Sequence, residues 1–385
     1  MKKLLPMLIL LVLLSACVPQ TPAATVTNTP TTGFLPTATP KNLSPLYQLR
    51  MFTGGDGWAT NIDKSHIYIT PNFGESWMEV TPPQLAARDS DGGIFTVFAN
   101  SQLAWICQSL PETPGVFYST DDGGLNWSQV RLDFPCGPMG IASTQKGYIL
   151  ASEGVGAGSH YVSMHTTGDG GLTWTTTFLH EPAGADDHGL PTSGNKSQFV
   201  VLDANTLLVG GSIPVPGMLY LFRSEDEGAS WTEIGCAGLP DQEDAEMAIT
   251  NIIRINSNEV IAAIRAYPSD NDSIPTHFCA SNDGGDSWRY LSSLDNVDFS
   301  DFGSIDTGVA FAEGKMYQTA DGGLTWLDVS AGLPPAITPV GVDLVNAVFG
   351  YLTTSISPDT LDQNRIFMTV NNGASWQSIP GIIVE

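Results

Sequence analysis

The sequence predicts an all-β fold, namely a single seven-bladed β-propeller of four-stranded antiparallel blades. An octapeptide recurs seven times, and the Trp that ends each copy returns about every 50 residues. A period of roughly 20–50 residues is typical of repeat architectures. Four short β-rich runs accompany each copy, and no segment of ten or more residues keeps a helical period. Four strands in each repeat match a propeller blade.

The octapeptide itself has the composition of a turn. It begins with Ser or Thr, carries Asp or Asn third and Gly fifth, and ends with Trp. Asp and Asn accept backbone hydrogen bonds within a turn, Gly tolerates positive φ, and Trp offers a large packing surface. Seven equivalent loops around a ring cannot converge on one substrate, so we interpret the copies as structural turns before the fourth strand. Their third and eighth residues are Asn72 and Trp77, Asp122 and Trp127, Asp169 and Trp174, Asp226 and Trp231, Asp283 and Trp288, Asp321 and Trp326, and Asn371 and Trp376.

The N-terminus has the pattern of a targeting segment. Residues 1–16 contain two lysines followed by an apolar run too short for a membrane span, and Cys17 follows Leu-Ser-Ala. This ending resembles a lipobox, so we expect a lipoprotein signal peptide and acylation of Cys17; an ordinary signal peptide that happens to hold a Cys is the alternative. Residues 17–44, rich in Pro and Thr, are expected to form an extended tether, and residues 45–385 the propeller. The expected location is extracytoplasmic, lipid-anchored to a bacterial membrane.

The charge narrows the range of partners. The chain has 40 acidic and 15 basic residues, a formal charge of −25, which becomes −27 when the two lysines of the signal peptide are removed. Nucleic acid is not expected as a partner, because phosphate binding needs clustered Lys and Arg. The folded body is not expected to adsorb to an anionic membrane, so membrane contact is expected through the lipid anchor only. A basic protein, peptide or envelope component suits this charge.

The four remaining cysteines lie outside the cytoplasm in this interpretation, where disulfides are allowed. Cys107 and Cys136 fall in one repeat, so we expect them to form a disulfide. Cys279 lies two residues before its octapeptide, where six other copies carry a large ring side chain. We therefore expect Cys279 to be a plain buried thiol. The spacing of the cysteines fits no zinc pattern.

The loops between second and third strands, and those joining successive blades, are long and acidic. Binding sites favour loops on a rigid scaffold, so this loop face is the expected binding face. Asp186, Asp187 and His188, close to His180 and Glu181, are candidate metal ligands, with a solvated polar loop as the alternative. A second acidic group is either a calcium patch or a charged surface; it comprises Asp241, Glu243, Asp244 and Glu246.

The octapeptide resembles the Asp-box, or bacterial neuraminidase repeat, of sialidases, xyloglucanase-type glycosidases, sortilin-type receptors and photosystem II assembly factors. The blade patterns GDGWATN…IYITPNFGESWMEV and DTGVAFAEGKMYQTADGGLTWLDV most resemble the photosystem II assembly and stability factors, over residues 45–380. This resemblance implies a single seven-bladed propeller with its boxes at the edge, away from the binding face. It implies little about function, because a fold hosts many activities. The family is expected to present an arginine-rich patch, whereas this chain is poor in arginine and strongly acidic, so no binding residue is transferred.

The function that we expect is non-enzymatic: a surface-anchored, monomeric binding or assembly propeller that acts through its loop face and needs no cofactor. The alternative is a sialidase-like or other glycoside hydrolase. Arg50 and Arg254 lie in first strands and allow a partial arginine cluster, but the Arg-Ile-Pro motif typical of sialidases is absent. Glycosidases also need two placed carboxylates, and no pair stands out in the sequence.

Overall fold

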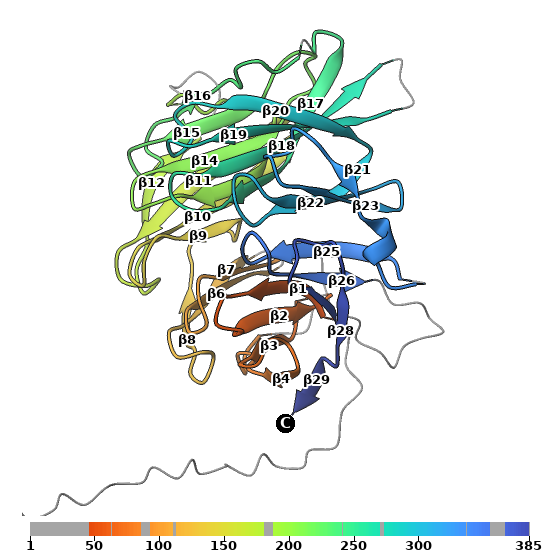
Figure 1. Ribbon diagram of the computed structural model, residues 1–385. Coiled ribbons are helices and arrows are strands. Elements are labelled where there is room, and N and C mark those ends of the chain that lie inside the picture. The colour runs from red at the N-terminus through yellow and green to blue at the C-terminus, as the bar shows by residue number, and fades with distance from the viewer. Residues whose placement is uncertain are drawn as a thin grey trace, which may run out of the picture. The chain divides into compact units, whose positions relative to one another are not determined.

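The computed structural model describes residues 46–62, 64–85, 93–110, 113–180, 188–240, 242–269, 273–335, 337–354 and 366–384. Regular structure in these ranges is almost entirely β-strand (Figure 1), which confirms the all-β prediction. The one helix in the described part is the 3-10 turn Ser330–Gly332. Within the same ranges, no helix is long and apolar enough to cross a membrane.

The strands pair in antiparallel groups of four that follow the chain order. The first group is β1 (Leu46–Met51), β2 (Gly57–Asn61), β3 (Ile67–Thr70) and β4 (Ser76–Glu79), which pair in that sequence. The second strand of a group is buried along its whole length in β2, β22 and β26, whereas the fourth is mostly exposed in β8, β16 and β24. In these groups the interior of the sheet is packed and its last strand faces solvent. The further strands are β5 (Ile94–Phe98), β6 (Ala104–Leu110), β7 (Thr113–Thr120), β8 (Ser128–Arg131), β9 (Met139–Ile141), β10 (Gly147–Gly156), β11 (Ser159–Thr167), β12 (Thr175–Leu179), β13 (Asn195–Val201), β14 (Leu207–Ser212), β15 (Leu221–Ser224), β16 (Thr232–Glu233), β17 (Ala245–Arg254), β18 (Val260–Pro268), β19 (Pro275–Ser281), β20 (Arg289–Asp295), β21 (Val297–Phe302), β22 (Gly308–Ala312), β23 (Lys315–Thr319), β24 (Leu327–Asp328), β25 (Pro339–Leu344), β26 (Gly350–Thr354), β27 (Ile366–Thr369), β28 (Gln377–Ile379) and β29 (Ile382–Val384).

Two pairings cross the boundaries between groups. Ser212 in β14 pairs with Ala248 in β17, so β13–β16 and β17–β20 join into one eight-stranded sheet. The C-terminal strand β29 pairs in parallel with β4, and the N–H of Ile382 donates to the carbonyl of Glu75 at 3.1 Å. Figure 1 shows β29 beside the first group of strands. The end of the chain is thus fastened to its first sheet.

The core is divided into clusters that lie between successive sheets, and the final Trp of each octapeptide packs in one of them. Trp231, for example, packs with Met164 from β11 and Val209 from β14. Trp77 packs with Tyr351 and Ile366, which belong to the last four-stranded group. The last sheet therefore packs against the first in the same way that neighbouring sheets pack elsewhere.

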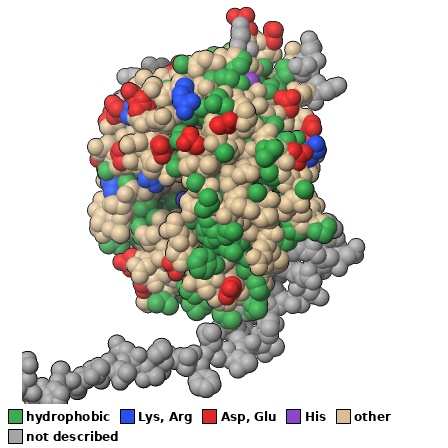
Figure 2. All heavy atoms as spheres, in the orientation of Figure 1, with side chains coloured by type: hydrophobic (Ala, Val, Ile, Leu, Met, Phe, Trp, Pro, Cys, Tyr) green, Lys and Arg blue, Asp and Glu red, His purple; other side chains and the backbone are tan. Residues whose placement is uncertain are grey.

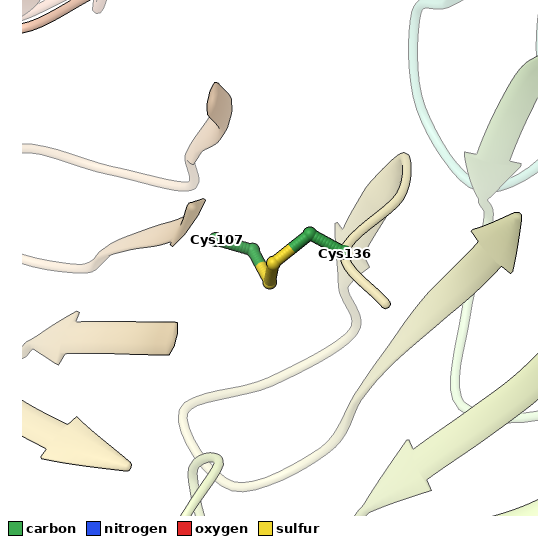
Figure 3. The surroundings of a disulfide bond; sticks show 2 residues. All are labelled: Cys107 and Cys136. Atoms are coloured by element: carbon green, nitrogen blue, oxygen red, sulfur yellow. A yellow bond between two sulfur atoms is a disulfide. The ribbon is translucent and has the colours of Figure 1, made fainter. Parts of the chain in front are cut away.

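Two disulfides join segments that are distant in sequence. Cys107 of β6 is bonded to Cys136, which follows β8, with Cα atoms 5.6 Å apart (Figure 3). Cys279 of β19 is bonded to Cys236, which follows β16, with Cα atoms 6.3 Å apart. The expectation of a free thiol at Cys279 was wrong. The connector after β16 runs alongside the next sheet, where Ala237 bridges Arg289, and this brings Cys236 to the buried Cys279.

Candidate functional site

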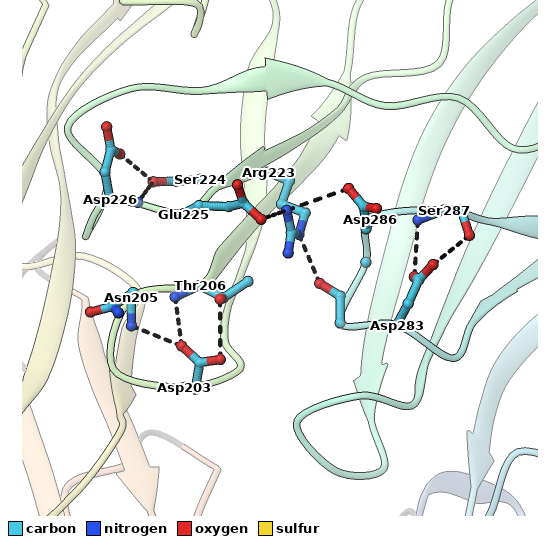
Figure 4. A network of polar contacts seen from close by, with 12 residues as sticks. Asp203, Asn205, Thr206, Arg223, Ser224, Glu225, Asp226, Asp283, Asp286 and Ser287 are labelled. Atoms are coloured by element: carbon cyan, nitrogen blue, oxygen red, sulfur yellow. Dashed lines mark hydrogen bonds and ion pairs between the residues drawn. The ribbon is translucent and has the colours of Figure 1, made fainter.

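The octapeptides form closed hydrogen-bonded turns, and Figure 4 shows the contacts between Ser224 and Asp226 and between Asp283 and Ser287 in two of them. Asp283 Oδ1 accepts the N–H of Ser287 at 2.9 Å and the hydroxyl of Ser281 at 2.8 Å, while its Oδ2 accepts the hydroxyl of Ser287 at 2.6 Å. These hydrogen bonds, led by those from Ser287, lower the pKa of Asp283 to about 2. The carboxylate is therefore engaged by its own turn. The third residue accepts the N–H of the seventh in the same way at Asn72, Asp122, Asp169, Asp226, Asp321 and Asn371.

Each octapeptide is also tied to the turn between the first two strands of its own group. The N–H of its fourth residue donates to a carbonyl of that turn, for instance Gly284 to Asn258 at 2.9 Å. Both turns thus lie at the same end of the sheet. The equivalent pairs are Phe73 to Gly55, Gly123 to Gln102, Gly170 to Gln145, Glu227 to Asn205, Gly322 to Asp306 and Asn372 to Val348.

A groove of about 660 Å³ lies between β16, with the connector that follows it, and the octapeptide that precedes β20. Arg223 crosses it: Nε donates to the carbonyl of Gly284 at 2.8 Å, and Nη1 lies 2.5 Å from Glu225 and 3.7 Å from Asp286 (Figure 4). The arginine therefore connects two adjacent boxes, and its charge is already matched by acidic neighbours.

The proposed metal ligands are only partly described. Asp186 and Asp187, like Asp241 of the acidic group, lie outside the described residues. The carbonyl of His188 accepts the N–H of Trp231 at 2.8 Å. His180 is buried, its Nδ1 accepting from the N–H of Val162 and its Nε2 donating to Leu190 O, so both ring nitrogens serve the backbone. Among the described residues, no group of three or more His, Cys, Asp or Glu could hold a metal ion.

A cavity of about 790 Å³ is lined by the first strand of every four-stranded group: β1, β5, β9, β13, β17, β21 and β25. We call it the axial cavity. Its wall includes part of each of these strands and, in several groups, residues of the turn that follows, as in the segments 139–144 and 251–255. The axial cavity is therefore not confined to the expected loop face. It also reaches toward the end of the sheets that carries the octapeptides. Figure 2 shows a hollow in the surface with Lys and Arg side chains at its edge.

One arc of the axial cavity is charged. Asp301 of β21, Asp343 of β25 and Arg50 of β1 occupy equivalent positions in their strands. Each lies two residues before the first residue whose backbone N–H donates a hydrogen bond within the following turn. The opposite arc is uncharged, because the equivalent residues in β5, β9 and β13 are Val97, Gly140 and Val200. The cavity is therefore amphipathic around its circumference.

The carboxylates of this arc also connect neighbouring first strands. Asp301 Oδ2 accepts the N–H of Leu344 at 2.6 Å, and Asp343 Oδ2 accepts the N–H of Met51 at 2.8 Å. Arg50 Nη1 lies 3.0 Å from Asp343 Oδ1. Burial raises the pKa of Asp343 despite this arginine. Burial, with the nearby Asp343, raises the pKa of Asp301 to about 7.

Arg254 of β17 completes the charged arc. Its Nη2 donates to the carbonyl of Leu202 at 3.0 Å, and within the described ranges it forms no ion pair. Burial and the charge of Arg50 lower the pKa of Arg254. Sequence reasoning placed both arginines in first strands but did not single out Asp301 or Asp343. These two carboxylates and Arg50 lie at different distances from their own octapeptides in the sequence, so the octapeptides alone do not align them.

No protein-family model matches the chain, and no curated protein matches it. Among solved structures, YCF48 from Cyanidioschyzon merolae is similar at 14% identity with a TM-score of 0.52, over 85% of this chain and 95% of that chain. YCF48 bound to a D1 peptide is similar at 13% identity and TM-score 0.52, over 87% and 93%. A prolyl endopeptidase is similar at 12% identity and TM-score 0.55, over 88% of this chain and 50% of that chain. At such identities the likeness shows the fold alone, and the chain is a propeller that resembles YCF48, as the box pattern predicted.

Proposed function

We propose that residues 45–385 form a single seven-bladed propeller that binds a segment of a protein or peptide in its axial cavity, without catalysis. The observation that carries this proposal is the cavity wall, to which the first strand of each four-stranded group contributes. The packing of Trp77 against Tyr351 and the parallel pairing of β29 with β4 support a closed ring.

The chemistry of the wall favours a peptide segment as ligand. Val97 and Val200 on one arc suit an apolar side chain, while Arg50, Arg254 and Asp301 on the other offer donors and acceptors. Ligand sites commonly combine an apolar surface with a few placed polar groups. The similar YCF48 structure with a D1 peptide supports the same class of ligand, and only that class is transferred.

The alternative function is glycoside hydrolysis, because the charged arc contains two carboxyl groups and the pKa of Asp301 is raised to about 7. A raised pKa suits a general acid. However, both carboxylates accept backbone N–H groups from the next first strand, and Asp343 also pairs with Arg50. We infer that their role is to join neighbouring strands. Turnover of arabinan, xyloglucan or a sialoside that is abolished by Asp301→Asn would establish the alternative.

In-cell photocrosslinking tests the proposed binding site. A photoreactive residue replaces Val200 in the axial cavity, and a matched control replaces Leu125, which is 71% exposed on an octapeptide. We expect a crosslinked peptide from position 200 and none from position 125, with the yield reduced when Arg254→Ala is added. Equal crosslinking at both positions, or none at position 200, would contradict binding in the cavity.

We propose further that Cys17 is acylated and anchors the propeller outside the cytoplasm through the tether. The support is the lipobox-like ending and the Pro/Thr-rich tract that follows it. Cys17→Ser should abolish labelling by a radioactive fatty acid and release the protein from the membrane fraction. Equal labelling of the variant and the natural chain would refute the anchor.

A further inference from the structure

A small side pocket of about 130 Å³ lies between the sheet of β17–β20 and the first strand of the next group, β21. Its wall includes Arg265 of β18, Thr276 of β19 and Asp298 of β21. Asn251 and Ser300 line both this side pocket and the axial cavity, so the two spaces adjoin.

Two hydrogen-bonding groups in this wall have no partner in the described part of the protein. Thr276 is 1% exposed, and its buried Oγ1 forms no hydrogen bond. Arg265 is its direct neighbour across the β18–β19 pair; its Nη2 donates to the carbonyl of Val297, but its buried Nε forms no hydrogen bond. A buried donor without an acceptor is unfavourable, and such groups in native proteins usually have a partner.

The chemistry of these groups specifies an acceptor, and the charge of arginine favours an anionic one. A carboxylate accepts charge-assisted hydrogen bonds from an arginine and can also accept from a hydroxyl. With a volume of about 130 Å³, the side pocket has room for several non-hydrogen atoms. Acetate, or the end of an acidic side chain, has that size.

Asp298 also lines the pocket, and its negative charge disfavours an anion there. It is exposed and forms no ion pair with Arg265. We therefore expect a bound carboxylate to lie toward Arg265 and Thr276. Arg265 and Thr276 should raise its affinity, whereas Asp298 should lower it.

We propose that the side pocket binds a carboxylate through Arg265 Nε and Thr276 Oγ1. The carboxylate comes either from a free small acid or from a peptide in the axial cavity, and the second source rests on the proposed function.

Acetate tests the side pocket independently of any peptide. With 15N-labelled arginine, the Nε–H resonance of Arg265 is followed by NMR during titration with sodium acetate at constant ionic strength. We expect a saturable shift with acetate and none with sodium chloride or acetamide. Thr276→Val should weaken acetate binding about tenfold, since a hydrogen bond to a charged group is worth about that factor. Asp298→Asn should strengthen it several-fold.

Stability separates ligand binding from a structural role. Thr276→Val removes a hydroxyl without a partner, so its melting temperature should equal or exceed that of the natural protein while acetate affinity falls. A lower melting temperature with unchanged acetate affinity would show that the pocket holds a structural water and would overturn the proposal. Arg265→Gln should abolish acetate-dependent stabilisation, whereas Arg289→Gln, an exposed arginine on β20, should leave it unchanged.

A peptide pair identifies the source of the carboxylate. Acetyl-Gly-Asp-Gly-amide and acetyl-Gly-Asn-Gly-amide differ only in that group. If the Asp peptide binds more tightly and Thr276→Val removes the difference, the carboxylate is carried by a peptide. If acetate binds at Arg265 but the two peptides bind equally or not at all, the side pocket is supported as a site for a free small acid, and the axial peptide loses support. No saturable acetate effect at Arg265 overturns the side pocket whatever the peptides do.

Discussion

At the scale of single residues, one side chain closes each octapeptide turn. Asp283 accepts three hydrogen bonds from Ser281 and Ser287, and Gly285 accepts the indole N–H of Trp288 at 3.0 Å. The positive φ of Gly285, 80°, places its carbonyl for this bond. The acidic residue therefore fixes the turn from which the packed Trp departs, and an acidic repeat does not need to mark a binding site.

Replacing Asp283 with Ala should destabilise the fold by about 1–2 kcal/mol, because the turn donors lose their acceptor while remaining partly solvated. The pKa of Asp283, lowered to about 2, lies below its unfolded value near 4. Its contribution is thus present above pH 4 and is lost as the pH falls through 2. Chemical denaturation at pH 7 and pH 2 measures both effects. An equal loss at the two pH values would contradict the role of the ionised carboxylate.

Asp301 should produce the opposite pH dependence. Its pKa is raised to about 7, so between pH 4 and pH 7 the unfolded carboxyl ionises while the folded one keeps its proton. Its contribution to stability is present below pH 4 and is lost as the pH rises through 7. Asp301→Asn keeps an acceptor for Leu344 N–H and cannot ionise, so it should stabilise the protein at pH 8 by roughly 2–4 kcal/mol. Unfolding free energies measured from pH 4 to 8 would contradict this if the variant followed the natural protein.

At the scale of elements, local features could be predicted from the sequence and contacts between sheets could not. Strand runs and octapeptides are local, because residues 281–288 contain nearly all the groups that close their turn. The Cys236–Cys279 disulfide depends on a connector lying against the following sheet, and the 43-residue separation gives no sign of it. The pairing of Asp301 with Leu344 likewise requires the two first strands to be adjacent. Sequence reasoning found the arginines of the axial cavity but not the carboxylates, because Asp301 and Asp343 lie at different distances from their own octapeptides.

At the scale of the whole propeller, the contact between the last and first groups is made of several weak parts. Trp77 packs with Tyr351 and Ile366, Arg50 pairs with Asp343, and β29 adds three residues in parallel to β4. The pairing of β29 joins the end of the chain to its first sheet, so it supports the contact between the first and last groups. Short parallel pairing is weak alone, and its value depends on the packing beside it.

Truncation after Gly381, which removes β29, should therefore destabilise the fold by about 1–3 kcal/mol. The loss of local stability should differ from sheet to sheet. Hydrogen exchange should accelerate most in β4 and in the last group, β25–β28, because Trp77 loses one of the contacts that hold it between them. The amides of β17–β20 should keep their protection from hydrogen exchange, because β29 pairs with β4 and not with these strands. Ile382→Ser, at a side chain that is 44% exposed, is the matched control and should change little, because it leaves the backbone pairing intact. Accelerated exchange spread evenly over all sheets would show that β29 contributes to general stability rather than to the junction between the first and last groups.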